Sequence, residues 1–147
     1  MIISDVRIER ATPEDLPAVL ALLTLHDLPP DGLEDHLSTL LVARRGGEIV
    51  GSAGLEVYAD GALLRSVAVS PEVSGRGVGR LLTGAALSLG VTMRMPAIYL
   101  LTTTAETYFP RLGFERTDRA AVPESVKASL EFKSACPTSA VVMRKLL

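Results

Sequence analysis

The fold of this chain is decided by the stretch Val73-Ser74-Gly75-Arg76-Gly77-Val78-Gly79-Arg80-Leu81. An apolar run, Leu63 to Val69, comes before it, and a helix-like spacing of apolar residues, Leu81 to Leu89, begins at its end. We therefore expect a strand, a glycine-rich turn and a helix start, in that order. A turn of this kind presents backbone N–H groups in front of the positive end of a helix, which predicts a site for a diphosphate.

Two common phosphate-binding loops do not fit this stretch. A P-loop ends in Gly-Lys followed by Ser or Thr, whereas this turn ends in Gly79-Arg80-Leu81. A dinucleotide-binding fingerprint needs a glycine at its sixth position, which is Arg80 when counted from Gly75 and Leu82 when counted from Gly77. An ordinary left-handed turn, which uses its glycines for backbone geometry alone, stays open as an alternative.

The remaining pattern is close to R/Q-x-x-G-x-G/A, with Ser74 where an Arg or Gln is usual. Residues Ser74 to Gly79 thus resemble the acyl-CoA loop of the Gcn5-related N-acetyltransferase (GNAT) superfamily. A second segment, Tyr108 to Phe114, is similar to the Y-x-x-x-G-F segment of that superfamily, and it follows at the distance of a helix, a strand and a short helix. The resemblance extends from Val6 to Leu147.

The resemblance and the residue patterns predict an α+β fold in a single N-acetyltransferase domain, residues 1–147. A GNAT-like sheet of six or seven strands, mixed but mostly antiparallel, would be flanked by about four helices. Apolar spacing places strands at 6–9, 39–45, 48–58, 61–69, 97–102, 114–118 and 140–145. It places helices at 13–25, 33–38, 79–91 and 105–112, with Thr12 capping the first of them and Gly90 ending the third, and residues 123–132 are helical or irregular.

Composition narrows the class of partner and the compartment. The net charge of −2 argues against a nucleic-acid surface, and no apolar run has the length of a membrane span. The N-terminus lacks a signal-peptide pattern, and the single cysteine, Cys136, fits a reducing cytoplasm. No metal site is expected, because His26 and His36 have no cysteine or third histidine nearby.

The resemblance implies acetyl-CoA as the co-substrate. The loop residues Ser74, Gly75, Arg76, Gly77, Val78, Gly79 and Arg80 would bind its diphosphate, mainly through the backbone N–H groups of residues 76–79. Arg76 and Arg80 can add positive charge, and the alternative for either is a solvated cation at a helix start. The strand before the loop, Val67-Ala68-Val69, would diverge from its neighbour and pair with the pantetheine arm. One of its N–H groups would polarise the acetyl carbonyl, a contribution of about 3–4 kcal/mol in other acyl-transfer enzymes.

Two residues are candidates for proton transfer. Many superfamily members have a tyrosine four residues before the glycine of G-F, where it protonates the departing sulfur, but this position is Phe109 here. Tyr108 lies one residue earlier, about 100° round a helix, and is therefore a poorly placed candidate for the acid. Glu56 lies on a central strand and is the candidate base, acting through water; an exposed strand carboxylate is the alternative.

Other residues point to the acceptor. Arg65 shares a strand face with Val67 and Val69, and it would bind an acidic acceptor through a fork-like pair unless an internal partner such as Glu56 or Glu131 takes that place. Thr103, at the end of a strand, would hydrogen-bond the pantetheine or the acceptor, or it is a plain β-branched strand residue.

A finer resemblance concerns Leu28-Pro29, Leu64-Arg65-Ser66-Val67 and the stretch from Val122 to Met143, which includes Cys136-Pro137. These segments resemble the arsenic-resistance N-acetyltransferases and, more distantly, the acetyltransferase domain of glutamate acetyltransferases. The resemblance implies that Leu28, Arg65 and Ser66 contact a small amino-acid-like amine. We expect an acetyl-CoA-dependent N-acetyltransferase, with a role in arsenic resistance and a homodimeric state. A catalytically weak acyl-CoA-binding sensor or partner module is the alternative.

Overall fold

A single twisted sheet runs through the computed structural model, which describes residues 5–135 and 140–147. Its strand order is β1-β2-β3-β4-β5-β7-β6, and every neighbouring pair is antiparallel except β4 and β5. The predicted mixed, mostly antiparallel sheet is therefore confirmed. The strands are β1 (Val6–Arg10), β2 (Leu40–Arg45), β3 (Glu48–Tyr58), β4 (Gly61–Val69), β5 (Ala97–Thr102), β6 (Glu115–Arg116) and β7 (Val141–Leu146).

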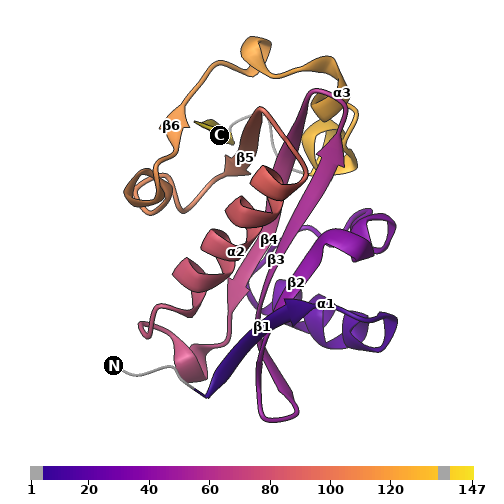
Figure 1. Ribbon diagram of the computed structural model, residues 1–147, viewed down its shortest axis with the longest axis vertical. Helices are drawn as coiled ribbons and strands as arrows, with labels where there is room; N and C mark the ends of the chain where they lie inside the picture. Colours follow the sequence, from indigo (N-terminus) through magenta and orange to yellow (C-terminus); the bar gives the residue numbers. More distant parts are fainter. Residues whose placement is uncertain (1–4, 136–139) are drawn as a thin grey trace.

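Helices cover both faces of this sheet (Figure 1). Alternate residues of β2 enter different cores, because successive side chains of a strand point to opposite faces. Leu41 and Ala43 share a core with α2, whereas Leu40 and Val42 share a core with α1. The α-helices are α1 (Leu16–Leu25), α2 (Val78–Thr92) and α3 (Glu124–Lys127). Short helices of the 3-10 or π type are η1 (Pro13–Asp15), η2 (Leu33–Thr39), η3 (Pro71–Val73), η4 (Phe109–Leu112), η5 (Arg119–Ala121) and η6 (Glu131–Ala135).

The entry into α1 is fixed by a partly buried ion pair between Asp15 and Arg44. The Asp15 carboxylate accepts hydrogen bonds from the Thr12 backbone N–H at 2.9 Å and from the Arg44 guanidinium at 2.9 and 3.2 Å. These bonds, above all those from Arg44, hold the pKa of Asp15 below its usual range. The carboxylate thereby ties the start of the helix to strand β2 across the sheet.

Several predicted elements differ from the structure. The first predicted helix is split into the 3-10 turn η1 and α1, and the helix predicted at 33–38 is the 3-10 helix η2. Helix α2 continues past Gly90 to Thr92. Gly90 is required by packing and does not end the helix, because a Cβ at this position would lie 2.8 Å from the Ile98 side chain. The helix predicted at 105–112 is a 3-10 turn that begins only at Phe109, with Pro110 in its first turn. The strand predicted at 114–118 pairs over two residues, Glu115–Arg116.

Strand β4 leaves its neighbour β5 soon after the two strands meet. The two parallel strands pair only at Ala62 with Ile98 and Leu63 with Tyr99. On its other edge β4 stays paired with β3, except at a bulge where Ser66 and Val67 together face one residue, Ala53. Ser66 has a φ of +59°, in the left-handed region that non-glycine residues rarely adopt. Such bulges re-aim a strand, and this one lies where the two strands separate.

Candidate active site

The gap between the diverging strands is a cavity of about 590 Å³. Its walls come from segments far apart in the sequence: the loop after α1, the second half of β4, the glycine loop, and the end of β5 with the turn that follows. One end of the cavity therefore meets the start of α2, and the other end meets the bulge of β4. This is the divergence that the resemblance implied for Val67-Ala68-Val69, of which Val67 and Val69 line the cavity.

The glycine loop forms the end of this cavity next to α2. Gly75 and Gly77 have φ values of +79° and +82°, a backbone conformation that would be strained for a residue with a side chain. The amides of Val78 and Gly79 belong to the first turn of α2, where no intrahelical partner exists. The amide of Arg76 departs from the prediction, because it donates a hydrogen bond to the Val73 carbonyl at 3.3 Å. The loop thus offers the N–H groups of the helix start rather than that of Arg76.

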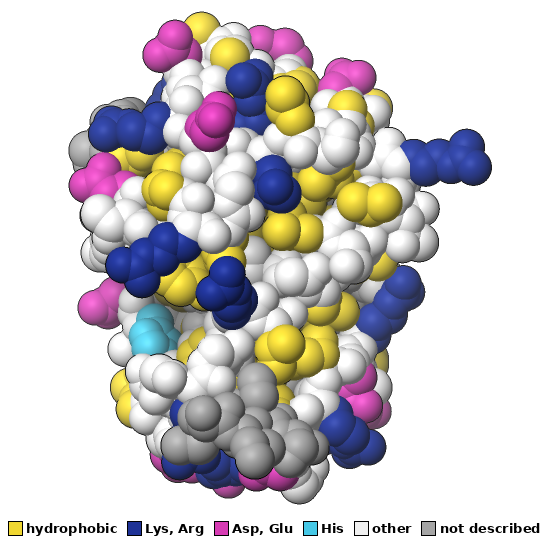
Figure 2. All heavy atoms as spheres, turned by 60° about the vertical axis from the view of Figure 1, so that its left-hand side comes forward, with side chains coloured by type: hydrophobic (Ala, Val, Ile, Leu, Met, Phe, Trp, Pro, Cys, Tyr) yellow, Lys and Arg dark blue, Asp and Glu magenta, His cyan; other side chains and the backbone are white. Residues whose placement is uncertain are grey.

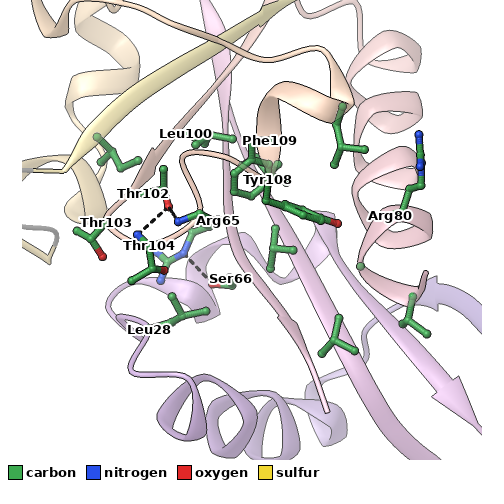
Figure 3. Close-up of a pocket in the computed structure, with 18 of the residues that line it drawn as sticks. Leu28, Arg65, Ser66, Arg80, Leu100, Thr102, Thr103, Thr104, Tyr108 and Phe109 are labelled. Atoms are coloured by element: carbon green, nitrogen blue, oxygen red, sulfur yellow. Dashed lines mark hydrogen bonds between the residues drawn. The ribbon is translucent and has the colours of Figure 1, made fainter. Parts of the chain in front are cut away.

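Positively charged side chains are dispersed over the face of the molecule that lies on the left side of Figure 1. Figure 2 shows Lys and Arg side chains scattered over this face among apolar and backbone atoms. In the close-up of the cavity, Arg80 projects from the first turn of α2 beside the loop (Figure 3). Arg80 is exposed and Arg76 is half-buried, so either guanidinium can reach an anion at the helix start without losing an internal ion pair among those found in the described residues.

The backbone of β4 presents polar groups to the cavity. The Ser70 N–H donates to the Val50 carbonyl of β3 at 2.8 Å, so by alternation the N–H and C=O groups of Val69 point away from β3, toward the gap. The Val69 carbonyl lies 2.8 Å from Nε2 of His26, at the end of α1, which can donate to it. Ala68, whose side chain packs in the core with α1, has its backbone directed to β3.

Arg65 is buried and its donors are occupied by the protein itself. Its Nη1 donates to Oε2 of Glu56 at 2.8 Å and to the Asp31 carbonyl at 2.5 Å, and its Nη2 donates to the Pro29 carbonyl at 2.8 Å. The side chain has 0% relative exposure. Of the two possibilities drawn from the sequence, this arrangement favours internal partners over a grip on an acidic acceptor. Arg65 holds the loop after α1 against the sheet.

Glu56 is the counter-ion of Arg65 and does not line the cavity. Its carboxylate also accepts a hydrogen bond from the Tyr58 hydroxyl at 2.6 Å, and His36 lies 3.8 Å away. Burial by itself would raise the pKa of Glu56, but hydrogen bonds from Ser129, Tyr58 and Arg65 outweigh it and the pKa lies below its usual value. A buried carboxylate with a lowered pKa and no exposure to the cavity is a poor base, which argues against the role predicted for Glu56.

A different carboxylate, Glu131, lines the cavity. Its side chain is 5% exposed, and its Oε1 lies 3.6 Å from Nε of Arg65. Burial raises the pKa of Glu131 to about 7, Arg65 opposes this rise, and the negative charges of Glu56 and Asp31 add to it. The sequence pointed to Glu131 only as an internal partner of Arg65.

Tyr108 and Phe109 both line the cavity. Phe109 is 7% exposed and packs edge-on against Phe114. Tyr108 extends its hydroxyl toward the start of α2 (Figure 3), where a Cβ added at Gly79 would lie 3.2 Å from it. Tyr108 precedes the 3-10 turn instead of lying within an α-helix. Burial raises the pKa of Tyr108, against the opposing effect of Arg80.

The other predicted contacts lie at the opposite end of the cavity. Leu28, on the loop that Arg65 holds, is half-buried, and Ser66 is buried at the bulge; both line the cavity. Thr103 is exposed and lines it as well. The neighbouring Thr102 is structural, because its hydroxyl accepts hydrogen bonds from the backbone N–H groups of Thr104 and Ala105. The predicted Cys136 falls outside the described residues.

A family model described as an acetyltransferase (GNAT) domain matches residues 36–116, which is more than half of the chain. The chain belongs to the GNAT acetyltransferase family. The matched residues include β3, β4, the glycine loop, α2, β5 and the turn with Tyr108, so the walls of the cavity fall largely within the GNAT domain.

Solved structures share the GNAT fold over nearly the whole chain. N-acetylglutamate synthase from Neisseria gonorrhoeae, complexed with coenzyme A and N-acetyl-glutamate, matches with a TM-score of 0.83 at 22% identity, over 97% of this chain and 35% of that chain. This chain therefore spans about a third of the length of that synthase. Rv2747 from Mycobacterium tuberculosis, in complex with CoA, matches with a TM-score of 0.79 at 22% identity, over 96% of this chain and 99% of that chain. A GNAT-family acetyltransferase from Staphylococcus aureus Mu50 matches with a TM-score of 0.77 at 15% identity, over 97% and 99%.

Within residues 5–135 and 140–147, no group of three or more His, Cys, Asp or Glu side chains could hold a metal ion. The helices in that part of the chain are too short or too polar to span a bilayer.

Proposed function

We propose that this chain is an acetyl-CoA-dependent N-acetyltransferase that acetylates a small amino-acid-like amine, in one catalytic domain over residues 1–147. The observation that carries the proposal is the cavity between β4 and β5, which joins the glycine loop at the start of α2 to the bulge of β4 in a GNAT-family chain. The complexes of the Neisseria synthase and of Rv2747 with coenzyme A support the choice of donor.

In this proposal the donor lies along the whole cavity. The N–H groups of Gly77, Val78 and Gly79 bind the diphosphate at the positive end of α2. Ser74 and Gly75 form the preceding part of the loop, and the side chains of Arg76 and Arg80 add positive charge. The pantetheine arm follows the free edge of β4, where the backbone groups of Val67 and Val69 take the place of a neighbouring strand. This places the acetyl group at the bulge.

Acetyl transfer then needs positioning more than acid catalysis. A free N–H of β4 near Val67 donates a hydrogen bond to the thioester oxygen as it becomes an oxyanion. A thiol pKa of about 8.5 makes thiolate expulsion near neutral pH cost only about 2 kcal/mol. The Tyr108 hydroxyl lies beside Gly79, at the end of the cavity that receives the diphosphate, so we assign it to donor binding rather than to protonation of the sulfur.

The acceptor would enter at the end of the cavity formed by Leu28, Ser66 and Thr103. The amino-acid product and ligand named for the Neisseria synthase complexes, N-acetyl-glutamate and L-arginine, support an amino-acid-like acceptor. Arsenic resistance is a hypothesis that rests on the sequence resemblance alone, part of which lies in residues 136–139, outside the described ones. An arsenic-bearing amino acid therefore belongs among the acceptors that are tested.

A catalytically weak acyl-CoA-binding sensor is the second candidate, and Phe109 in place of the usual tyrosine favours it. Release of free thiol from acetyl-CoA across a panel of amines separates the two functions. Thiol release that depends on one class of amine would support the acetyltransferase. Tight binding of coenzyme A without release by any amine would support the sensor. A homodimer and a cytoplasmic location remain predictions, which sedimentation of the purified chain and localisation of the expressed protein would test.

A further inference from the structure

Glu131 is a carboxylate in the cavity wall that lies beside the bulge of β4. Nε of Arg65 links the two, because it is 3.6 Å from Oε1 of Glu131 and 3.1 Å from Oγ of Ser66. Ser66 is the bulge residue, and the proposed acetyl position is next to it. Glu131 thus lies within reach of an amine that approaches the thioester from the acceptor end.

The buried charges around Arg65 do not balance when both carboxylates are ionised. Arg65 forms a short ion pair with Glu56, at 2.8 Å, and donates its other hydrogen bonds to Ser66 and to two backbone carbonyls. Glu131 keeps only the longer contact of 3.6 Å, and no hydrogen bond to its carboxylate is found from the described residues. A buried carboxylate with so little protein solvation needs a cationic partner or a proton.

We propose that Glu131 is the catalytic base, which binds the acceptor as an ammonium ion and removes a proton from it. This inference rests on the proposed acetyl transfer, and it assigns to Glu131 the role of base that Glu56 is poorly placed to fill. Glu131, in η6, rather than Glu56, in β3, would then favour a positively charged acceptor and accept the proton that this acceptor loses.

The step can be written with its protons and electrons. The ammonium gives one proton to Glu131, and the lone pair that this leaves on nitrogen attacks the thioester carbon. The tetrahedral adduct collapses, the carbon–sulfur bond breaks, and its electron pair leaves with the sulfur as the thiolate. The nitrogen loses its second proton to water, the amide is complete, and the thiolate takes up a proton from solvent. Glu131 returns its proton to water before the next turnover.

The carboxyl of Glu131 suits this role near neutral pH. A base works best when its pKa is close to the operating pH, and burial raises the pKa of Glu131 to about 7. A base acts in its ionised form, so the activity should rise as the pH increases through about 7. The charged groups that act on Glu131 are the buried Arg65 and Glu56 and the exposed Asp31, and of these only Arg65 favours its ionised form.

The test is the pH dependence of kcat/KM for the best amine of the panel, with wild type, Glu131→Gln, Glu131→Asp and the control Glu124→Gln. Glu124 has a side chain that is 91% exposed and sits on α3, so the control makes the same chemical change outside the cavity. We expect Glu131→Gln to lose about 10²-fold in kcat/KM together with the limb near pH 7. Glu131→Asp should retain that limb at a reduced rate, and Glu124→Gln should match wild type.

Binding of coenzyme A, measured by titration calorimetry, separates this inference from the proposed function. Unchanged affinity in Glu131→Gln, with the lost limb, supports the base. A Glu131→Gln variant that acetylates the amine within about threefold of wild type and keeps the limb would overturn the role of Glu131 and leave the acetyltransferase standing. Wild type that acetylates no amine would overturn the proposed function and this inference with it.

Discussion

Replacing Arg65 by methionine should destabilise the fold rather than weaken the binding of an acidic acceptor. The substitution keeps most of the side-chain volume but removes the charge that pairs with Glu56, and both side chains are almost fully buried, at 0% and 2% exposure. Removing one partner of a buried pair costs about 3–5 kcal/mol, because an uncompensated charge is left behind. The total stability of a domain is only about 5–15 kcal/mol, so Arg65→Met should lie close to unfolding.

Urea unfolding followed by circular dichroism measures this loss, and a double variant isolates its cause. In Arg65→Met with Glu56→Gln neither charge remains, so part of the lost stability should return, with a coupling free energy of about 2 kcal/mol or more. The control is Arg7→Met, the same change at an exposed position on β1 of the same sheet. An Arg65→Met protein within about 1 kcal/mol of wild type, with a raised KM for acidic amines only, would refute the structural role of Arg65.

Two further predictions concern the start of α1 and the tyrosine of the cavity. Asp15→Asn should lower the free energy of unfolding by about 1–3 kcal/mol at neutral pH. Because the pKa of Asp15 is lowered by its bonds to Arg44 and Thr12, the difference from wild type should fade as the pH drops below 3.8, whereas Glu14→Gln, an exposed neighbour, should change little. Tyr108→Phe should raise the KM for acetyl-CoA about 2- to 10-fold with a smaller effect on kcat, since one hydrogen bond contributes about 0.5–1.5 kcal/mol. Loss of kcat at unchanged KM would instead make Tyr108 the acid.

The local elements were predictable because each depends on neighbours in the sequence. Strands 48–58, 61–69 and 97–102 have the predicted bounds, since the spacing of apolar residues within each stretch specifies them. The glycine loop was predictable for the same reason, because its backbone geometry and its place before a helix are both written in a short stretch. Gly90 was misread, because a glycine that ends a helix and a glycine that packs against Ile98 look alike in sequence.

The acceptor end of the site was not predictable from local patterns. Arg65 contacts Pro29, Asp31, Glu56 and Glu131, which belong to three separate segments that only the folded sheet brings together. Sequence reasoning found Glu56 and Glu131 as partners of Arg65, yet it could not tell which carboxylate faces the cavity. Their different hydrogen-bond partners, and hence the opposite directions of their pKa shifts, arise from tertiary structure alone.

The central claim is that acyl-CoA binds where the glycine loop meets α2, and a Gly79→Arg variant tests it most directly. Gly79 faces Tyr108 and Val69 across the end of the cavity, so an arginine side chain would fill the space assigned to the donor. Gly84→Arg is the matched control, because Gly84 lies on the exposed side of the same helix and a Cβ there would meet nothing within 4 Å.

Calorimetric titration of both variants with coenzyme A, after circular dichroism has confirmed that each is folded, gives the result. We predict an affinity at least about 100-fold weaker for Gly79→Arg, equivalent to about 2.7 kcal/mol or more, and an affinity close to wild type for Gly84→Arg. A folded Gly79→Arg protein that binds coenzyme A as tightly as wild type would contradict the assignment of the loop.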